Sequence, residues 1–171
     1  GDHCTINRWV EQNHQPQRPA FIVNRLDRAA QGLMLIAHTK SAASALSGLF
    51  EKRAINKKYT ALVSGSFPKQ LRLDTAVDEK YAVSSASLLA YSPITKQSLV
   101  IVEIETGRKH QIRKHLSGAG FPIIGDRLYG PEVGDVTINL CLVSTYLAFN
   151  CPITGLDKSY RIKDDYLPKV G

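Results

Sequence analysis

Residues 106–130 read TGRKHQIRKHLSGAGFPIIGDRLYG, and this stretch carries the most chemical information in the chain. From Thr106 to Gly125 it holds four Lys or Arg, two His and no acidic residue. The spacing of its apolar residues predicts a helix over about 108–117, ended by Gly118. Cations at a helix N-terminus form a site for anions such as phosphates. A solvated basic helix is the alternative, but the glycines before and after the segment favour a constrained backbone.

The two histidines of this stretch are not expected to form a metal site. His110 and His115 lie five positions apart, whereas helical zinc pairs are separated by four, and no carboxylate accompanies them. Helical spacing instead places Lys109, Arg113 and Leu116 along one side of the predicted helix.

An aspartate between two arginines forms a second cluster, Asn24-Arg25-Leu26-Asp27-Arg28. It lies between two apolar segments, 21–23 and 32–37, which predict a short strand and a buried strand. If the arginines reach the carboxylate, Asp27 would be an anion at neutral pH, suited to nucleophilic or base chemistry. A structural salt bridge at a strand end is the alternative.

A tyrosine among lysines, Lys57-Lys58-Tyr59, forms a third cluster. Such a tyrosine can stack on a nucleobase while the lysines contact phosphates. The alternative is an ordinary strand tyrosine with solvated neighbours.

The remaining segments predict mostly strands with two helices. Residues 1–20 form an entry loop or a short helix, and Thr39 caps an amphipathic helix over about 40–53. Further strands are expected over residues 59–63, 85–92, 97–105, 138–149 and 158–162. This order favours an α+β fold with a mixed, largely antiparallel sheet and a few helices over a doubly wound fold.

Length and composition are those of one globular domain covering residues 1–171. Hydrophobic residues make up 43%, enough for a packed core, and 22 Lys and Arg against 15 Asp and Glu give a net charge of +7. A basic chain suggests a polyanionic partner such as RNA or DNA, although the excess charge could simply make the surface soluble.

Several classes of protein are not supported by the sequence. No apolar run approaches the roughly 18–20 residues that span a bilayer, so no membrane partner is expected. The three cysteines, Cys4, Cys141 and Cys151, are too scattered for a disulfide framework and indicate a reducing cytoplasm. There is neither a Gly-rich nucleotide-binding loop nor a Gly-x-Ser-x-Gly elbow.

Together these clusters resemble one family, the RluA-type RNA pseudouridine synthases. Arg25-Leu26-Asp27 followed by Gly32-Leu33-Met34-Leu35 is similar to the motif around the catalytic aspartate of that family. Residues 58–65, KYTALVSG, are similar to its tyrosine-bearing strand. Residues 107–116 and 121–130 match its Gly-Arg-x-His-Gln-Ile-Arg and Gly-Asp-x-x-Tyr-Gly signatures. Residues 140–155 resemble its closing strand, so the resemblance covers about 22–160.

Some positions depart from the family pattern. Asn24 stands where His is usual, Ala30-Gln31 where Thr-Ser is usual, and Val143 where His is common. The Lys-Pro-x-Gly segment that normally precedes the aspartate motif is not found, so we expect the usual N-terminal segment to be missing from this chain.

The resemblance implies an isomerase that breaks the N-glycosidic bond of a uridine, rotates the uracil and rejoins it through carbon. Asp27 would be the nucleophile or the base, and Tyr59 would stack on the base. Arg113 would ion-pair with Asp27, and a guanidinium can hold a carboxylate with two parallel hydrogen bonds. Arg25 would enter the RNA stack when the target nucleotide leaves it, since a stacked uridine must be flipped out to react.

The partner implied is a structured ribosomal or transfer RNA, with no metal or other cofactor. The expected RNA-binding residues are Arg25, Arg28, Lys57, Lys58, Arg108, Lys109, His110 and Lys114. We expect a cytoplasmic monomer. Two alternatives remain: a non-catalytic RNA-binding protein that keeps the fold, and an RNA-processing hydrolase that uses the same basic cleft.

Overall fold

The computed structural model describes residues 5–131 and 137–171, and the chain forms two compact units. Within the described residues, the first unit comprises residues 5–26, 34–56 and 148–159, and the rest forms the second unit. The prediction of a single domain over residues 1–171 stays a prediction. Cys4 lies outside the described residues, and Cys141 and Cys151 are free thiols.

The first unit is built from two helices and a short ribbon. It contains α1 (Ile6–Asn13), β1 (Phe21–Ile22) paired antiparallel with β3 (Ile36–Ala37), and α2 (Lys40–Glu51). The hydroxyl of Thr39 accepts a hydrogen bond from the Ala42 N–H (3.1 Å), which caps α2 as predicted. Asn24 has a structural role, because its side-chain oxygen accepts from the Leu35 N–H (2.8 Å) between β1 and β3.

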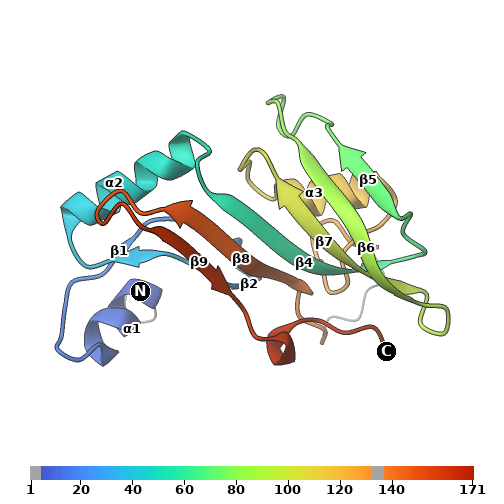
Figure 1. Cartoon of the computed structure of the whole chain (residues 1–171). Coiled ribbons are helices and arrows are strands. Elements are labelled where there is room, and N and C mark those ends of the chain that lie inside the picture. Colours follow the sequence, from blue (N-terminus) through green and yellow to red (C-terminus); the bar gives the residue numbers. More distant parts are fainter. Residues whose placement is uncertain (1–4, 132–136) are drawn as a thin grey trace. The chain divides into compact units, whose positions relative to one another are not determined.

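The second unit is built on an antiparallel meander of adjacent strands, which can be followed in Figure 1. In sheet order these are β4 (Asn56–Ser64), β7 (Gln97–Ile104), β6 (Ser84–Ser92) and β5 (Gln70–Leu73). Beyond β4 the sheet continues with β8 (Leu142–Asn150), flanked by β2 (Gln31–Gly32) and β9 (Asp157–Arg161). The β2–β8 pair is parallel, so the sheet is mixed and mostly antiparallel, which confirms the predicted α+β class.

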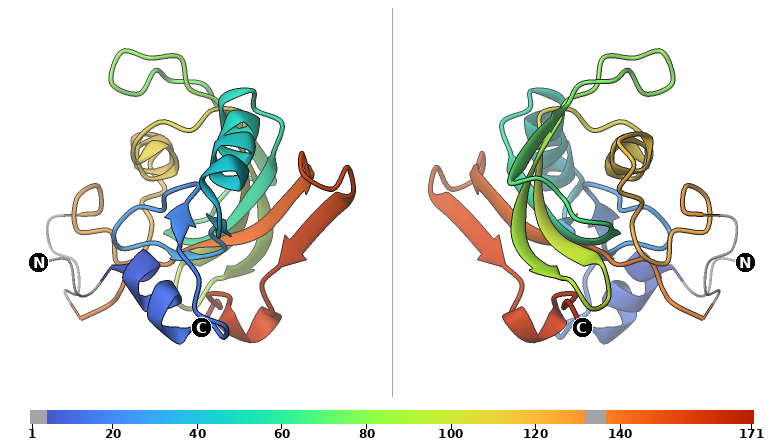
Figure 2. Two further views of the ribbon diagram at one scale, coloured as in Figure 1. Left: turned by 90° about the vertical axis from the view of Figure 1, so that its left-hand side faces the viewer. Right: turned by 90° about the vertical axis from the view of Figure 1, so that its right-hand side faces the viewer.

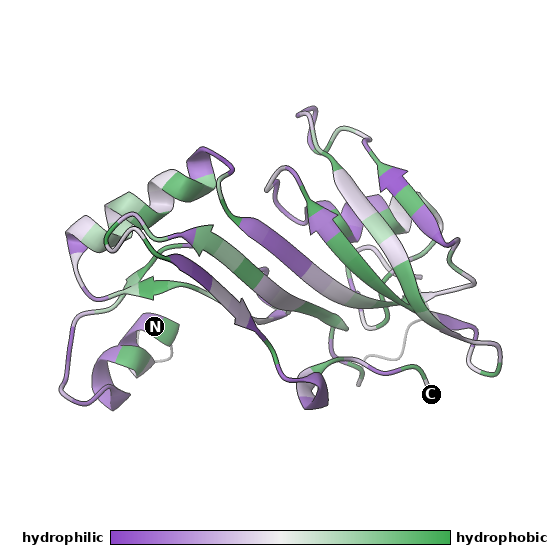
Figure 3. Cartoon of the chain, viewed as in Figure 1, coloured by the Kyte–Doolittle hydropathy of each residue, from purple (hydrophilic) through white to green (hydrophobic). Residues whose placement is uncertain are grey.

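Helix α3 (Gln111–Gly118) packs on one face of this meander, as Figure 2 shows. Its residues Ile112 and Leu116 are buried in one apolar cluster with Ala61 of β4 and with Val100 and Val102 of β7. The helix packs here because the strands offer it apolar side chains. Figure 3 shows that the middle of β7 is hydrophobic, whereas β4 begins with hydrophilic residues. The apolar residues of α3 therefore fix the helix on the sheet, and its polar residues remain for the site.

Two expectations are corrected, and two elements are added. Residues 32–37 are not one buried strand, because Gly32 belongs to β2 and the chain joins a different sheet at β3. Helix α3 begins at Gln111 rather than near 108, so Arg108 and Lys109 precede it. Strand β5 and the 3-10 helix η2 (Asp164–Tyr166) were not predicted. In the two described ranges, no helix has the length and apolar character that a membrane span requires.

Candidate active site

Asp27 is held in a turn that is fixed to the sheet a few residues later. The Ala30 N–H donates to the Asp27 carbonyl (2.9 Å), and β2 then pairs with β8, where the Leu33 N–H donates to the Ser144 carbonyl (2.9 Å). Gly32 has φ +113, and a Cβ there would lie 2.3 Å from the Ser144 carbonyl oxygen. Only glycine allows this approach, so Gly32 is what positions the aspartate turn.

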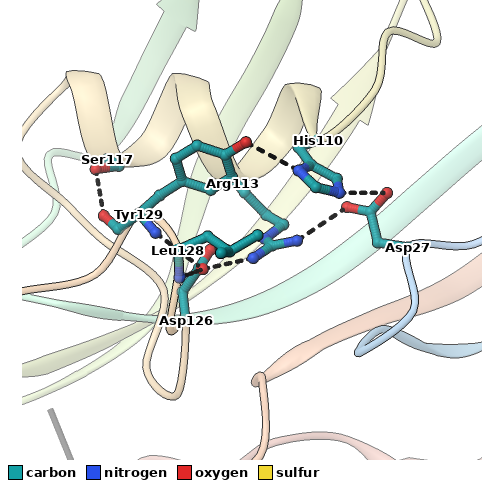
Figure 4. A network of polar contacts seen from close by, with 7 residues as sticks. All are labelled: Asp27, His110, Arg113, Ser117, Asp126, Leu128 and Tyr129. Atoms are coloured by element: carbon teal, nitrogen blue, oxygen red, sulfur yellow. Dashed lines mark hydrogen bonds and ion pairs between the residues drawn. The ribbon is translucent and has the colours of Figure 1, made fainter.

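The buried guanidinium of Arg113 joins two aspartates, as Figure 4 shows. Its Nε and Nη2 donate to the two carboxylate oxygens of Asp126 at 2.8 and 2.6 Å. Its Nη1 lies 3.7 Å from Oδ2 of Asp27. The predicted pairing of Arg113 with Asp27 is therefore present as a looser contact, whereas the two-bond pair expected with Asp27 is made with Asp126.

Asp126 is fixed by the turn that follows α3. Its carboxylate accepts from the N–H groups of Leu128 (3.0 Å) and Tyr129 (3.1 Å). A Cβ at Gly130 would lie 2.3 Å from the Asp126 carbonyl oxygen, which explains a glycine at that position. Burial alone would raise the pKa of Asp126, but the hydrogen bonds from Arg113 and the two backbone N–H groups outweigh it and lower the pKa. Asp126 is thus an anion that anchors Arg113.

His110 lies between Tyr129 and Asp27. Its Nδ1 is 2.9 Å from the Tyr129 hydroxyl, and its Nε2 is 3.9 Å from Oδ1 of Asp27. When the Tyr129 hydroxyl donates to Nδ1, the neutral imidazole carries its proton on Nε2, the atom that faces Asp27. His110 has φ 55, in the left-handed region, where His is more frequent than most residues. This backbone conformation directs the ring toward the aspartate at the start of α3.

Tyr59 lies on β4 in the same unit, and its ring is half-buried. Burial, followed by the negative charge of Asp27, raises the pKa of Tyr59 to about 12, against a smaller lowering by the hydrogen bond with Ser144. The hydroxyl is therefore neutral at physiological pH. Ser144 connects Tyr59 with the Gly32 backbone, so one buried residue contacts both elements that carry the site.

The lysines before Tyr59 point to opposite faces of β4, because successive side chains of a strand alternate. Lys57 shares the face of Tyr59, its Nζ lies 3.9 Å from where a Cβ at Gly107 would be, and burial lowers the pKa of this amine. Lys58 instead forms an ion pair with Glu103 on β7 (2.9 Å). Of the two, Lys57 is the cation beside Gly107, three residues before His110.

The other expected RNA-binding residues are placed differently from one another. Arg108 donates from Nε to the Tyr81 carbonyl (3.0 Å), and Lys114 forms an ion pair with Asp78. Arg28 and Lys109 are exposed in the second unit. Arg25 is exposed in the first unit, and its role at the RNA stack stays a prediction.

The structure adds residues to the site that sequence reasoning missed. Asp126 and Tyr129 belong to the quoted Gly-Asp-x-x-Tyr-Gly motif but were assigned no role, and Ser144 was not singled out. The available signal was the motif itself, in which an acidic and an aromatic residue sit between glycines at 125 and 130. His110 lies beside the Asp27 carboxylate, and its expected role in RNA binding stays a prediction.

The cluster unites a carboxylate that is 24% exposed, a guanidinium that is 5% exposed and a neutral tyrosine. A partly exposed carboxylate with a fixed cation behind it can act as a nucleophile or a base. Among the described residues, no three His, Cys, Asp or Glu are grouped as metal ligands would be. Fold and site thus define an α+β domain with an acid–base cluster in basic surroundings.

Comparison with known proteins identifies the family. The sequence model of the family described as RNA pseudouridylate synthase matches residues 2–118. The chain is 31% identical over 162 residues to the dual-specificity RNA pseudouridine synthase RluA of Haemophilus influenzae, covering 84% of this chain and 73% of that protein. It is 30% identical over 175 residues to the ribosomal large subunit pseudouridine synthase D of Pseudomonas aeruginosa, covering 86% of this chain and 55% of that protein.

The chain belongs to the RNA pseudouridylate synthase family, a family of isomerases, and the resemblance to its RluA-type members is confirmed. The fold is also that of the solved human RNA pseudouridylate synthase domain containing 1, with a TM-score of 0.78 at 23% identity. That match covers 87% of this chain and 71% of the human chain. The chain spans about half the length of the Pseudomonas relative.

Proposed function

We propose that this chain is the catalytic part of an RNA pseudouridine synthase that acts on uridines of ribosomal or transfer RNA, with Asp27 as the essential residue. The observation that carries the proposal is the position of the Asp27 carboxylate. It lies 3.7 Å from the buried guanidinium of Arg113 and close enough to Tyr59 for its charge to raise the pKa of that tyrosine. The names of the relatives support RNA as the substrate class. That the reaction requires no metal or other cofactor stays a prediction.

The reaction is a rearrangement within one nucleotide. The bond between N1 of uracil and C1′ of the ribose breaks, the base rotates, and a bond forms between C5 and C1′. The C5 proton is lost and N1 gains a proton, so atoms and electrons balance without an oxidant or a reductant. Asp27 acts either as the nucleophile at C1′ or as the base that removes the sugar proton.

The other residues of the cluster have supporting roles. Arg113, anchored by Asp126, orients the Asp27 carboxylate and provides fixed positive charge beside it. Tyr59 stacks on the flipped base, and its neutral hydroxyl is available to exchange a proton with the sugar. His110, with the Nε2 side of its ring toward Asp27, is a positioning residue in this proposal rather than a phosphate contact.

Flipping a uridine out of its stack costs a few kcal/mol. Cations offset that cost by binding the backbone phosphates. The cations of the second unit on or near the elements that carry the site include Arg28, Lys57, Lys58, Arg108, Lys109 and Lys114.

The test is the Asp27→Asn variant, assayed by release of tritium from RNA labelled at C5 of uridine. We expect the variant to release no tritium above background and to bind RNA within several-fold of the wild-type affinity, because the neutral amide keeps the shape of the carboxylate. The matched control is Asp165→Asn, at an exposed position of η2 in the second unit, which should keep full activity.

Two results would contradict the proposal. An active Asp27→Asn variant would rule out the proposed mechanism. A wild-type chain that binds RNA but releases no tritium from ribosomal or transfer RNA would favour the alternative, a non-catalytic RNA-binding protein that keeps the fold.

A further inference from the structure

The loop that joins β5 to β6, residues 74–83, projects from the sheet in Figures 1 and 2, near the start of α3. We call this loop the shelf. Hydrogen bonds fix it to residues 106–115. The Val83 N–H donates to the Thr106 hydroxyl (3.0 Å), Gln111 donates to the Val83 carbonyl (2.9 Å), Arg108 to the Tyr81 carbonyl (3.0 Å), and a ring nitrogen of His115 lies 2.8 Å from the Thr75 carbonyl. The shelf is therefore an anchored surface.

The backbone of the shelf is also fixed internally. Val77 and Lys80 exchange N–H···O bonds of 3.0 and 3.1 Å around a tight turn in which Asp78 and Glu79 have φ 51 and 62. Val77 is buried on one side of the turn, and residues 82–83 are fully buried on the other. The chain is thus anchored by apolar residues on both sides of Tyr81.

Tyr81 itself is 58% exposed although its neighbours are buried. The backbone that carries this exposed ring is already fixed. The loop therefore loses no conformational freedom when a partner binds to the ring. Such a ring is a ready surface for another flat group.

The charges around Tyr81 indicate what kind of flat group would stack on its ring. Lys80 precedes it in the chain, and Arg108 contacts its carbonyl. Asp74, Asp78 and Glu79 are the acidic groups of the shelf, and Asp78 is already paired with Lys114. Lys109 adds a further exposed cation. An aromatic ring among cations is the arrangement that binds single-stranded nucleic acid.

Two contacts join the shelf to the segment that carries His110 and Arg113 of the candidate active site. Arg108, which contacts the shelf, lies two residues before His110, and Lys114, which pairs with Asp78, directly follows Arg113. His110 and Arg113 are the residues that face Asp27. An RNA strand with its target uridine at Asp27 would therefore have neighbouring nucleotides near the shelf.

We propose that Tyr81 stacks on an unpaired base of the substrate RNA beside the target uridine, while Lys80 and Arg108 contact the adjoining phosphates. The inference rests on the proposed function and specifies its substrate class, RNA in which nucleotides next to the target uridine are unpaired. Base–aromatic stacking tolerates any base but requires an exposed face, which a continuous duplex does not offer.

The experiment compares Tyr81→Ala, Tyr81→Phe and Tyr81→Trp, with binding measured by fluorescence anisotropy. The probes are an RNA hairpin with an all-uridine loop and a fully paired duplex of the same stem. We expect Tyr81→Ala to weaken hairpin binding roughly tenfold and to leave duplex binding within twofold, whereas the two aromatic replacements keep hairpin affinity. The matched control is Tyr91→Ala, at an exposed position on the opposite end of β6, which should change neither affinity.

A second measurement does not depend on affinity. In a Trp9→Phe background, which removes the single tryptophan, the fluorescence of Tyr81→Trp should be quenched by the hairpin and not by the duplex. Hairpin affinity within twofold of wild type for Tyr81→Ala, or no quenching of Trp at this position, would overturn the inference. Either result with an inactive Asp27→Asn variant leaves the proposed function standing, so the two failures are distinguishable.

Discussion

Arg113 and Asp126 form a two-bond ion pair, with Nε–Oδ2 and Nη2–Oδ1 distances of 2.8 and 2.6 Å, and both side chains are at most 5% exposed. The hydrogen bonds to Asp126 raise the pKa of Arg113 despite its burial. The guanidinium that faces Asp27 is therefore held from behind by a second carboxylate. This places the geometry of the site under the control of the turn that carries Asp126.

Asp126→Asn should lower both stability and activity. Removing one partner of a buried ion pair costs about 3–5 kcal/mol, and we expect the lower end because Asp27 remains near Arg113. The free Arg113 side chain should shift toward Asp27, so kcat should fall about tenfold or more while RNA affinity stays within several-fold. Denaturant unfolding and tritium release measure the two effects.

The stability effect of Asp126 should depend on pH with a defined sign. Its folded-state pKa is lowered, so its stabilising contribution is present above the ordinary carboxylate pKa and is lost as pH falls through the lowered value. The difference in unfolding free energy between wild type and Asp126→Asn should thus shrink at acid pH. A difference that is constant down to strong acid would contradict the assigned role.

Tyr59→Phe should separate stacking from proton exchange. The ring remains, so KM should change less than about twofold, whereas loss of a hydroxyl that exchanges a proton should lower kcat roughly 100-fold. Because the pKa of Tyr59 is about 12, its hydroxyl stays protonated from neutral to mildly alkaline pH. The pH profiles of kcat for wild type and variant should therefore run parallel. A wild-type rate that climbs steadily above neutral pH, with a flat profile for the variant, would show instead that the ionised tyrosine acts.

Gly32→Ala should disturb the aspartate turn without touching a reacting group. The new Cβ would lie 2.3 Å from the Ser144 carbonyl oxygen at a backbone φ of +113. We expect a loss of about 1–3 kcal/mol of stability and a clear drop in kcat, since β2 must move away from β8. Gly48→Ala is the matched control, because a Cβ at this position of α2 meets nothing within 4 Å, and it should stabilise the protein by about 1 kcal/mol. If thermal unfolding gives the same Tm for Gly32→Ala and Gly48→Ala, the close approach of Gly32 to Ser144 does not have the role assigned to it.

Lys109→Ala should act on RNA binding alone. Lys109 is exposed beside the site, so its removal should weaken binding modestly and reduce the slope of log affinity against log salt by roughly 0.7–0.9. Lys69→Ala, an exposed lysine just before β5, provides the comparison and should leave the slope unchanged. Equal slopes for wild type and Lys109→Ala would exclude Lys109 from the phosphate contacts.

Much of the fold follows from local pattern in the sequence. Strands β4, β6 and β7 and helix α2 are long enough for their periodicity and caps to predict them within a few residues. The prediction of one strand over residues 32–37 was wrong, although the apolar run there resembles a strand. The positive φ of Gly32 depends on its close approach to Ser144, which is a tertiary contact that the local sequence does not indicate. Strand β5 has four residues, too few for an alternating pattern to stand out.

For the candidate site too, the sequence predicts some features and not others. Asp27, Tyr59 and Arg113 were expected from motifs, and the structure brings them into one unit. The pairing of Arg113 with Asp126 could not be predicted, because which of two aspartates receives the two-bond contact depends on the turn geometry at Asp126. The start of α3 was misplaced because His110 adopts a left-handed backbone just before the helix, and the spacing of residues along the sequence does not indicate that conformation.

If the chain binds RNA as proposed, the two aspartates on either side of Arg113 also influence which part of the RNA can approach. Two carboxylates against one guanidinium leave the centre of the site with one negative charge in excess, whereas the cations lie at its border. A phosphate group would be repelled from the centre and attracted to the border, while an uncharged ribose and uracil meet no such barrier. Under the proposed function, this charge distribution favours the uncharged ribose and uracil at the centre of the site and the phosphates at its border.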